Sequence, residues 1–159
     1  CRACPPRAPP TGAGPCCPGR AGSVPLAAEP NGELPLRTEA DIVASRQVVR
    51  QLAVALKFSL VDQTKMITAA SELSRNTVVH GGGGRMRWAT IEDGLRRGLR
   101  LDFEDEGPGI ADVNLALTDG WTSGGGMGLG LPGGKRLVHE FSLRSEPGKG
   151  TCVTITRWK

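Results

Sequence analysis

The 159-residue chain has no long apolar run, no tyrosine and few aromatic residues of any kind. None of its apolar stretches approaches the ~20 residues that a membrane-spanning helix needs, so no membrane association is predicted. No charged start followed by an apolar segment marks a secretory signal. Aromatic residues make up only 4% of the chain, and the Lys and Arg residues behind the net charge of +4 are scattered. Without a basic stripe interleaved with aromatic residues, no nucleic-acid partner is predicted either.

Cysteine is scarce in the part of the chain that we expect to fold. Four of the five cysteines lie near the N-terminus, namely Cys1, Cys4, Cys16 and Cys17. A zinc site needs two spaced pairs, and the adjacent Cys16 and Cys17 lack the usual spacer. Only Cys152 remains for the rest of the chain, which argues against a disulfide scaffold and suits a reducing, cytoplasmic location.

The first 33 residues differ in composition from everything that follows. Proline, glycine, alanine and arginine dominate them, hydrophobic periodicity is absent, and large apolar side chains are almost absent. Such a segment cannot bury enough surface to offset the entropy that it would lose on ordering. We therefore predict a disordered tail over residues 1–33 and one folded domain over residues 34–159.

Hydrophobic periodicity predicts helices and hairpins within the folded part. The predicted helices follow the capping residue Thr38 as far as residue 57 and then cover residues 61–79 and 111–117. The predicted strands cover residues 34–37, 85–92, 97–105, 141–145 and 151–157. The second and third of these strands are expected to form one hairpin, and the last two another.

Asp105 is the residue around which this pattern is organised. Its strand has a predicted apolar side of Leu99, Leu101, Phe103 and Asp105 and a predicted water-facing side of Arg100, Asp102 and Glu104. An unpaired carboxylate on an apolar side would cost several kcal/mol, so Asp105 needs a hydrogen-bond donor. Gly107 and Gly109 leave bare backbone beside it. Two interpretations stand: a carboxylate that binds a purine amino group, or a buried aspartate that caps the following turn.

Thr151 is predicted to point inward at the start of its strand, on the same side as Val153 and Ile155. Two polar groups at the ends of inward strand faces, Asp105 and Thr151, can meet one ligand. The alternative is that Thr151 is only a turn hydroxyl.

Glu72 and Asn76 lie one helical turn apart, so their side chains share a face of the predicted helix. A carboxylate and an amide oxygen suit magnesium and the positioning of a water or hydroxyl group. A solvated surface pair near a helix end is the alternative. Four glycines, Gly81 to Gly84, follow directly.

A second glycine-rich block covers residues 122–134 and includes Gly124, Gly125, Gly126, Gly128 and Gly130. Exposed backbone N–H groups and a helix expected to start near Gly128 would together form a phosphate cradle. The block lacks the P-loop pattern, and no parallel strand–helix–strand unit surrounds it as in a dinucleotide fold. Flexible linkers have similar sequences, so the block alone is weak support.

Four ordered motifs resemble one family: Glu72-x-x-x-Asn76, Asp105-x-Gly107-x-Gly109, Gly126-x-Gly128-x-Gly130 and Gly148-x-Gly150-Thr151. They resemble the N, G1, G2 and G3 boxes of the GHKL ATPase/kinase superfamily. The resemblance implies a Bergerat ATP-binding fold, a two-layer α/β sandwich in which helices back a mixed, mostly antiparallel sheet. The short domain, with no room for a phosphoacceptor or transducer domain, is similar to the bacterial partner-switching serine/threonine kinases. Runs around residues 104–112, 119–125 and 130–137 resemble the switch kinases of the stressosome in particular.

The resemblance also implies roles for residues. By the family's pattern, Asp105 binds the adenine amino group with Thr151 nearby, Asn76 holds Mg²⁺, and Glu72 is the catalytic base for the acceptor hydroxyl. The residues expected to contact ATP are Asn76, Asp105, Gly107, Gly109, Gly124, Gly125, Gly126, Gly128, Gly130 and Thr151.

The implied partners are a STAS-domain protein as substrate and, after release, a PP2C-type phosphatase. Two other interpretations stay open: an anti-sigma factor with kinase activity, and a docking module that uses ATP as a structural ligand. The sequence does not decide the oligomeric state, and a homo-oligomer stays among the alternatives.

Overall fold

The computed structural model describes residues 31–118 and 130–159. Its elements in chain order are β1 (Gly32–Leu36), α1 (Glu39–Ala55), α2 (Leu60–Val79), β2 (Gly84–Asp93), β3 (Arg96–Asp105), α3 (Val113–Ala116), α4 (Gly130–Arg136), β4 (Glu140–Glu146) and β5 (Gly150–Trp158). Residues 1–30 of the predicted 1–33 tail and most of the second glycine block lie outside the described residues. No helix in the described ranges combines the length and apolar content that crossing a bilayer requires.

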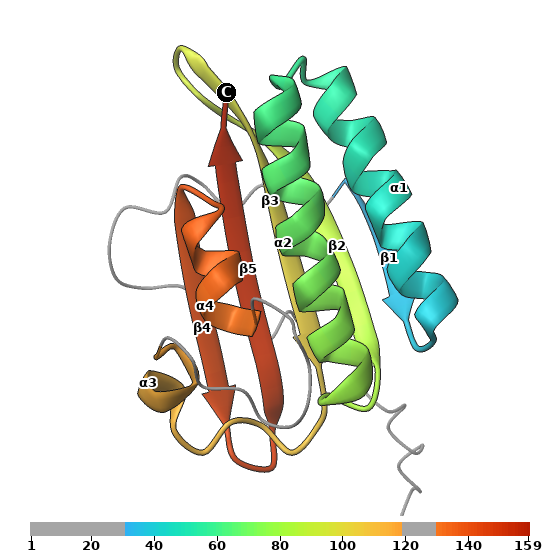
Figure 1. The fold of residues 1–159 in the computed structure, drawn as a ribbon, viewed down its shortest axis with the longest axis vertical. Coiled ribbons are helices and arrows are strands. Elements are labelled where there is room, and N and C mark those ends of the chain that lie inside the picture. Colours follow the sequence, from blue (N-terminus) through green and yellow to red (C-terminus); the bar gives the residue numbers. More distant parts are fainter. Residues whose placement is uncertain (1–30, 119–129) are drawn as a thin grey trace, which may run out of the picture.

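The five strands form one sheet in the order β1-β2-β3-β5-β4, and every pair of neighbours is antiparallel. Helices α1, α2 and α4 lie against one face of this sheet (Figure 1). The predicted two-layer α/β sandwich is therefore confirmed. The described strands include no parallel pair, so the sheet is antiparallel rather than mixed.

The core lies between the sheet and the helices, as the alternation in β3 predicts. Leu99, Leu101 and Phe103 are almost completely buried on the helix-facing side of β3. They belong to one apolar cluster with Val49 of α1 and Leu73 of α2. Burial of such side chains contributes roughly 1.5–3 kcal/mol each, so this alternation both fixes which side of β3 faces inward and holds the helices in place.

Both long helices begin where their capping residues predict. The Thr38 hydroxyl accepts a hydrogen bond from the Asp41 backbone N–H at 3.4 Å, and the Asp41 carboxylate accepts from the Thr38 N–H at 2.9 Å, which forms a capping box. Ser59 caps α2, which begins at Leu60, one residue before the predicted start, and ends at Val79 as predicted. Because α2 ends at Val79, Gly81 follows two residues later and lies beside the end of β3.

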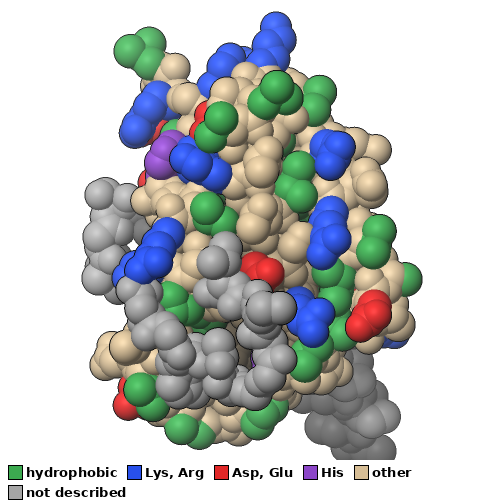
Figure 2. All heavy atoms as spheres, viewed as in Figure 1, with side chains coloured by type: hydrophobic (Ala, Val, Ile, Leu, Met, Phe, Trp, Pro, Cys, Tyr) green, Lys and Arg blue, Asp and Glu red, His purple; other side chains and the backbone are tan. Residues whose placement is uncertain are grey.

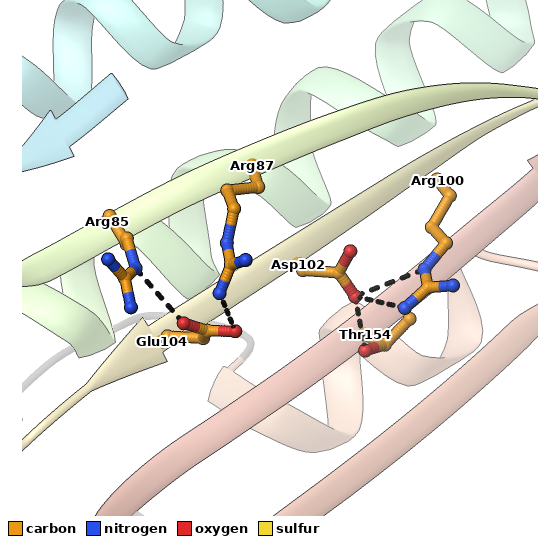
Figure 3. A network of polar contacts seen from close by, with 6 residues as sticks. All are labelled: Arg85, Arg87, Arg100, Asp102, Glu104 and Thr154. Carbon is orange, nitrogen blue, oxygen red and sulfur yellow. Dashed lines mark hydrogen bonds and ion pairs between the residues drawn. The ribbon is translucent and has the colours of Figure 1, made fainter. Parts of the chain in front are cut away.

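The face of the sheet opposite the helices is not uniformly exposed to solvent. The prediction that Glu104 faces water was wrong. Glu104 is only 8% exposed. Figure 3 shows its carboxylate between two guanidinium groups, those of Arg85 and Arg87 on the neighbouring strand β2. Burial alone would raise the pKa of Glu104, but the hydrogen bonds from Arg87 and Arg85 hold it below the ordinary value. A buried carboxylate is tolerated here because it is paired.

A second cluster on this face surrounds Asp102 (Figure 3). The Asp102 carboxylate accepts a hydrogen bond from the Thr154 hydroxyl at 2.6 Å and pairs with Arg100 at 3.0 Å. Polar side chains on this face thus pair along and across strands, whereas the functional residues described below lie on the helix-facing side or at the strand ends.

The sheet begins earlier than predicted, because β1 starts at Gly32 rather than at residue 34. The Asn31 backbone N–H donates to the Trp88 carbonyl at 2.7 Å, and the Asn31 side-chain oxygen accepts from the Thr90 N–H at 2.5 Å. Residues 31–33 therefore belong to the fold and not to the predicted tail. Hydrophobic periodicity did not predict residues 31–33 as part of a strand, because they continue a run of small and polar residues that shows no periodicity.

We expect two N-terminal truncations to behave differently. A chain that begins at Asn31 should unfold in urea at the same midpoint as the full chain. A chain that begins at Leu34 should lose about 1–3 kcal/mol in free energy of unfolding, because the Asn31 hydrogen bonds and part of the β1–β2 ladder are removed. Equal midpoints for the two truncations would show that residues 31–33 add nothing to stability.

Candidate nucleotide site

Three segments that are distant in sequence meet at one end of the sheet. They are the end of β3 at Asp105, the glycine-rich connection that leaves the C-terminus of α2, and the β4–β5 hairpin (Figure 1). In the sheet register Asp105 lies opposite Gly84 on one side and opposite Thr151 on the other. The register therefore places Asp105 and Thr151, both predicted to point inward, side by side.

The Asp105 side chain is half-buried, and its hydrogen bonds are one-sided. Oδ1 accepts from the backbone N–H groups of Gly107 at 3.0 Å and Thr151 at 3.2 Å. Among the described residues both bonds go to Oδ1, which leaves Oδ2 available to a ligand. The turn-capping interpretation thus accounts for one oxygen of Asp105, and the ligand interpretation, which concerns the other oxygen, stays a prediction.

The electrostatics of Asp105 are unusual for a surface carboxylate. Burial raises its pKa above the ordinary value, and the hydrogen bonds from the Gly107 and Thr151 backbone oppose this only in part. None of its neighbours in these bonds is a cation, in contrast to Glu104. A carboxylate that lacks a cationic partner at a partly buried position is a candidate for binding an external donor.

Glycines surround Asp105 because a side chain would not fit. A Cβ on Gly150 would lie 2.0 Å from the Asp105 carbonyl oxygen, and Gly150 has a φ of +92°. A Cβ on Gly109, at a φ of +72°, would lie 2.2 Å from the Glu146 carbonyl oxygen. A Cβ on Gly107 would lie 2.7 Å from Gly81. The predicted Gly107 thus lies beside the carboxylate, whereas Gly109 packs against the backbone of Glu146 at the β4–β5 hairpin; we call Gly81, Gly107, Gly109 and Gly150 the glycine cradle.

Gly81 is a residue of this cradle that the sequence analysis did not single out. A Cβ at this position would lie 2.4 Å from Cγ of Asp105 and 2.7 Å from its free oxygen, Oδ2. The tight packing of Gly81 against Asp105 could not be read from the sequence, where Gly81 is only the first of four glycines.

We expect Gly81→Ala to displace the Asp105 side chain and to weaken nucleotide binding. Overpacking of this kind typically costs about 1–3 kcal/mol in stability. Glu92→Ala is the control, since Glu92 is exposed at the far end of the sheet from Asp105. Thermal unfolding with and without ATP checks both effects. If Gly81→Ala binds ATP as tightly as Glu92→Ala does, the close packing of Gly81 on Asp105 has no role in binding.

Glu72 and Asn76 lie in the last two turns of α2, and both are half-buried beside the fully buried Leu73 and Ser74. The Asn76 carbonyl accepts from the N–H groups of His80 at 2.9 Å and Gly81 at 3.1 Å. The turn that carries Asn76 therefore leads directly into the glycine that packs on Asp105. The structure thus brings the predicted metal and base residues to the same end of the molecule as Asp105.

The metal predicted at Asn76 would have few protein ligands. No group of three or more His, Cys, Asp or Glu side chains gathers in the described part of the chain. Mg²⁺ is commonly held by only one or two protein oxygens together with substrate phosphates and water. The Asn76 amide oxygen fits that mode and not a site made entirely by the protein.

The predicted phosphate cradle is only partly within the described residues. Gly124, Gly125, Gly126 and Gly128 lie outside them. Gly130 is the first residue described after this gap and has a φ of +59°, and α4 is described from there to Arg136, so the expected helix start near Gly128 lies outside the described residues. The Arg157 guanidinium donates to the Leu137 carbonyl at 2.7 Å and to the Asp62 carboxylate at 2.8 Å, which ties the end of α4 to α2.

Figure 2 shows the helix-bearing face, where Lys and Arg side chains are spread widely and Asp and Glu side chains are few. Such a face attracts anionic ligands by its summed field.

Comparison with known proteins gives a family match that covers most of the described domain. Residues 61–159 match the family described as histidine kinase-, DNA gyrase B-, and HSP90-like ATPase. The chain is 45% identical over 123 residues to the serine/threonine-protein kinase RsbT of Bacillus subtilis, a match that covers 77% of this chain and 92% of that kinase.

More distant relatives and a solved structure agree with this match. The chain is 28% identical over 118 residues to an anti-sigma F factor of Thermoanaerobacter sp., covering 72% of this chain and 82% of that protein. The crystal structure of the RsbU and RsbW domains of a Mycobacterium tuberculosis protein has a similar fold, with a TM-score of 0.56 and 21% identity. That match covers 82% of this chain and 34% of the longer mycobacterial chain.

Proposed function

The chain belongs to the histidine kinase-, DNA gyrase B- and HSP90-like ATPase family, and we propose that it is an ATP- and Mg²⁺-dependent serine/threonine protein kinase of a cytoplasmic partner-switching module. Its proposed substrate is a STAS-domain protein. The single observation on which the proposal rests is the free oxygen of Asp105, which lies among glycines near the C-terminal end of α2. Glu72 and Asn76 belong to the last two turns of the same helix.

Each residue has a distinct task in the proposed reaction. Asp105 accepts a hydrogen bond from the adenine amino group through Oδ2. Asn76 holds Mg²⁺, which neutralises charge on the transferred phosphoryl group when it is bound. Glu72 orients the serine or threonine hydroxyl of the partner and accepts its proton as the hydroxyl oxygen bonds to the transferred phosphorus. ADP keeps the oxygen of the bond that breaks.

Phosphorylation would also act as a release step. A phosphate group adds about −1.5 to −2 charge to the partner surface and disrupts a complex that was formed without it. The freed kinase would then bind a PP2C-type phosphatase. The 45% identity to a serine/threonine kinase over 92% of its length supports catalysis over a docking module that only binds ATP.

An anti-sigma kinase is the second candidate, and the similarity to anti-sigma F factors supports it. The identity to those proteins is 28–29%, lower than the 45% to the RsbT kinase. A sigma factor is therefore the alternative partner, with the same site chemistry.

Transfer of radiolabelled phosphate from ATP to candidate partners tests the proposal. STAS-domain proteins and sigma factors from the same genome are incubated with the kinase, with and without EDTA. We expect Mg²⁺-dependent labelling of a STAS-domain protein on serine or threonine. Stable capture of a sigma factor in the presence of ATP would support the second candidate. If no STAS-domain protein is labelled although ATP binds, the kinase proposal is wrong.

A further inference from the structure

Ser145 of β4 lies directly opposite Thr151 in the sheet register, next to the two groups of the proposed adenine site. It is the last residue on the inward side of its strand, after Phe141 and Leu143. Its hydroxyl accepts a hydrogen bond from the Ile110 backbone N–H at 2.7 Å and donates one to the Gly150 carbonyl at 3.0 Å. Its third contact is the Thr151 hydroxyl, also at 3.0 Å.

The direction of that third hydrogen bond follows from counting protons. A serine hydroxyl has one proton and two lone pairs. A backbone N–H can only donate, and a backbone carbonyl can only accept. The Ser145 hydroxyl therefore donates its proton to the Gly150 carbonyl and accepts from the Ile110 N–H through one lone pair. The Thr151 hydroxyl must then be the donor to Ser145. The Thr151 hydroxyl donates its only proton in this bond. Toward any other group that hydroxyl can therefore act only as a hydrogen-bond acceptor.

Two acceptors therefore belong to residues that lie opposite each other in β3 and β5. One is Oδ2 of Asp105, whose other oxygen is occupied by the Gly107 and Thr151 N–H groups. The other is the Thr151 hydroxyl, fixed as an acceptor by Ser145. Acceptors attract a donor such as an exocyclic amino group and repel a carbonyl oxygen.

We propose that Ser145 is a positioning residue which, by fixing the Thr151 hydroxyl as an acceptor, makes the site select purine nucleotides with an amino group at C6 over those with a carbonyl there. This inference rests on the proposed function, since it concerns the same nucleotide site. Ser145 itself need not touch the nucleotide.

The test compares the affinities of ATP and inosine triphosphate by calorimetry, because the two differ in an amino group or a carbonyl at C6. Ser145→Ala frees the Thr151 hydroxyl to rotate and donate, so we expect the ratio of ATP affinity to inosine triphosphate affinity to fall about three- to tenfold. Ser145→Thr keeps a hydroxyl and should keep the ratio. Ser142→Ala is the matched control, because Ser142 is exposed on the other side of the same strand.

A double-mutant cycle separates this role from a purely structural one. Thr151→Val should lower the ratio by itself, and Ser145→Ala should then have no further effect on it. If Ser145→Ala weakens both nucleotides equally, or if the two changes are additive, Ser145 only supports the fold. If Ser145→Ala does not fold, the inference requires that Thr151→Val lowers the ratio and Ser145→Thr does not.

The test also tells this inference apart from the proposed function. Wild-type protein that binds no ATP would overturn both. Wild-type protein that binds ATP, with a ratio unchanged in Ser145→Ala, would overturn the role of Ser145 alone.

Discussion

Asp105→Asn should lower ATP affinity about ten- to a hundredfold while the protein stays folded. The substitution replaces an ionised acceptor at Oδ2 with either a neutral oxygen or an amide donor. A hydrogen bond to a charged group contributes roughly 1.5–3 kcal/mol, and most of that is lost when the acceptor becomes neutral. Calorimetric titration with ATP measures the change directly.

The stability of Asp105→Asn should not fall with its affinity. Because burial raises the pKa of Asp105 in the folded state, ionisation disfavours folding, and the wild type loses stability as the pH rises from the ordinary carboxyl pKa through the raised one. The asparagine does not ionise and can still accept from Gly107 and Thr151 through its oxygen. At neutral pH we therefore expect an unfolding midpoint at or above that of the wild type, and a loss of this pH dependence.

Asp102→Asn is the matched control on the same strand. Asp102 lies on the helix-free face, where it accepts from Thr154 and pairs with Arg100 (Figure 3). Its substitution should cost stability and leave ATP affinity unchanged, the opposite of the result expected at Asp105. Unchanged ATP affinity in a folded Asp105→Asn protein would contradict the assignment of Asp105 to the nucleotide.

Local signals in the sequence were sufficient to predict most of the architecture. The capping box at Thr38 and the helical spacing of apolar residues predicted α1 and α2 to within a few residues. Period-two alternation placed Asp105 and Thr151 on inward sides, and the register later paired them. These features depend on residues close in sequence, so one chain read alone is enough to predict them.

Other features depend on which strands become neighbours, and the sequence does not carry that information in any local pattern. Glu104 was predicted to face solvent because apolar and polar residues alternate along its strand. In the fold, Arg85 and Arg87 of β2 pair with its carboxylate and cover it. In the sequence nothing distinguishes Gly81 from the three glycines that follow it, and only the fold shows that it packs against Asp105. Ser145 did have a signal, since it continues the inward side of Phe141 and Leu143 just as Asp105 continues that of Leu101 and Phe103.

Glu72→Gln should separate phosphotransfer from binding. If Glu72 only orients and deprotonates the acceptor hydroxyl, the variant should bind Mg-ATP as the wild type does and lose transfer by about 10²–10⁴-fold, the usual range for general-base catalysis. Asn76→Ala should behave differently and lose metal-dependent nucleotide binding and transfer together. Glu92→Gln is the control, because Glu92 is exposed near the β2–β3 turn, at the far end of the sheet from Asp105.

The same variant tests whether phosphate transfer drives partner release. Glu72 is half-buried beside Leu73, so its replacement should leave docking of the STAS-domain partner intact. The complex with Glu72→Gln should then persist when Mg-ATP is added, because no phosphate reaches the partner to repel the kinase. A pull-down of the partner with and without Mg-ATP compares this variant with the wild type and Glu92→Gln, both of which should release. Release by Glu72→Gln as well would mean that nucleotide binding alone switches the complex, and the docking-module interpretation would replace the kinase.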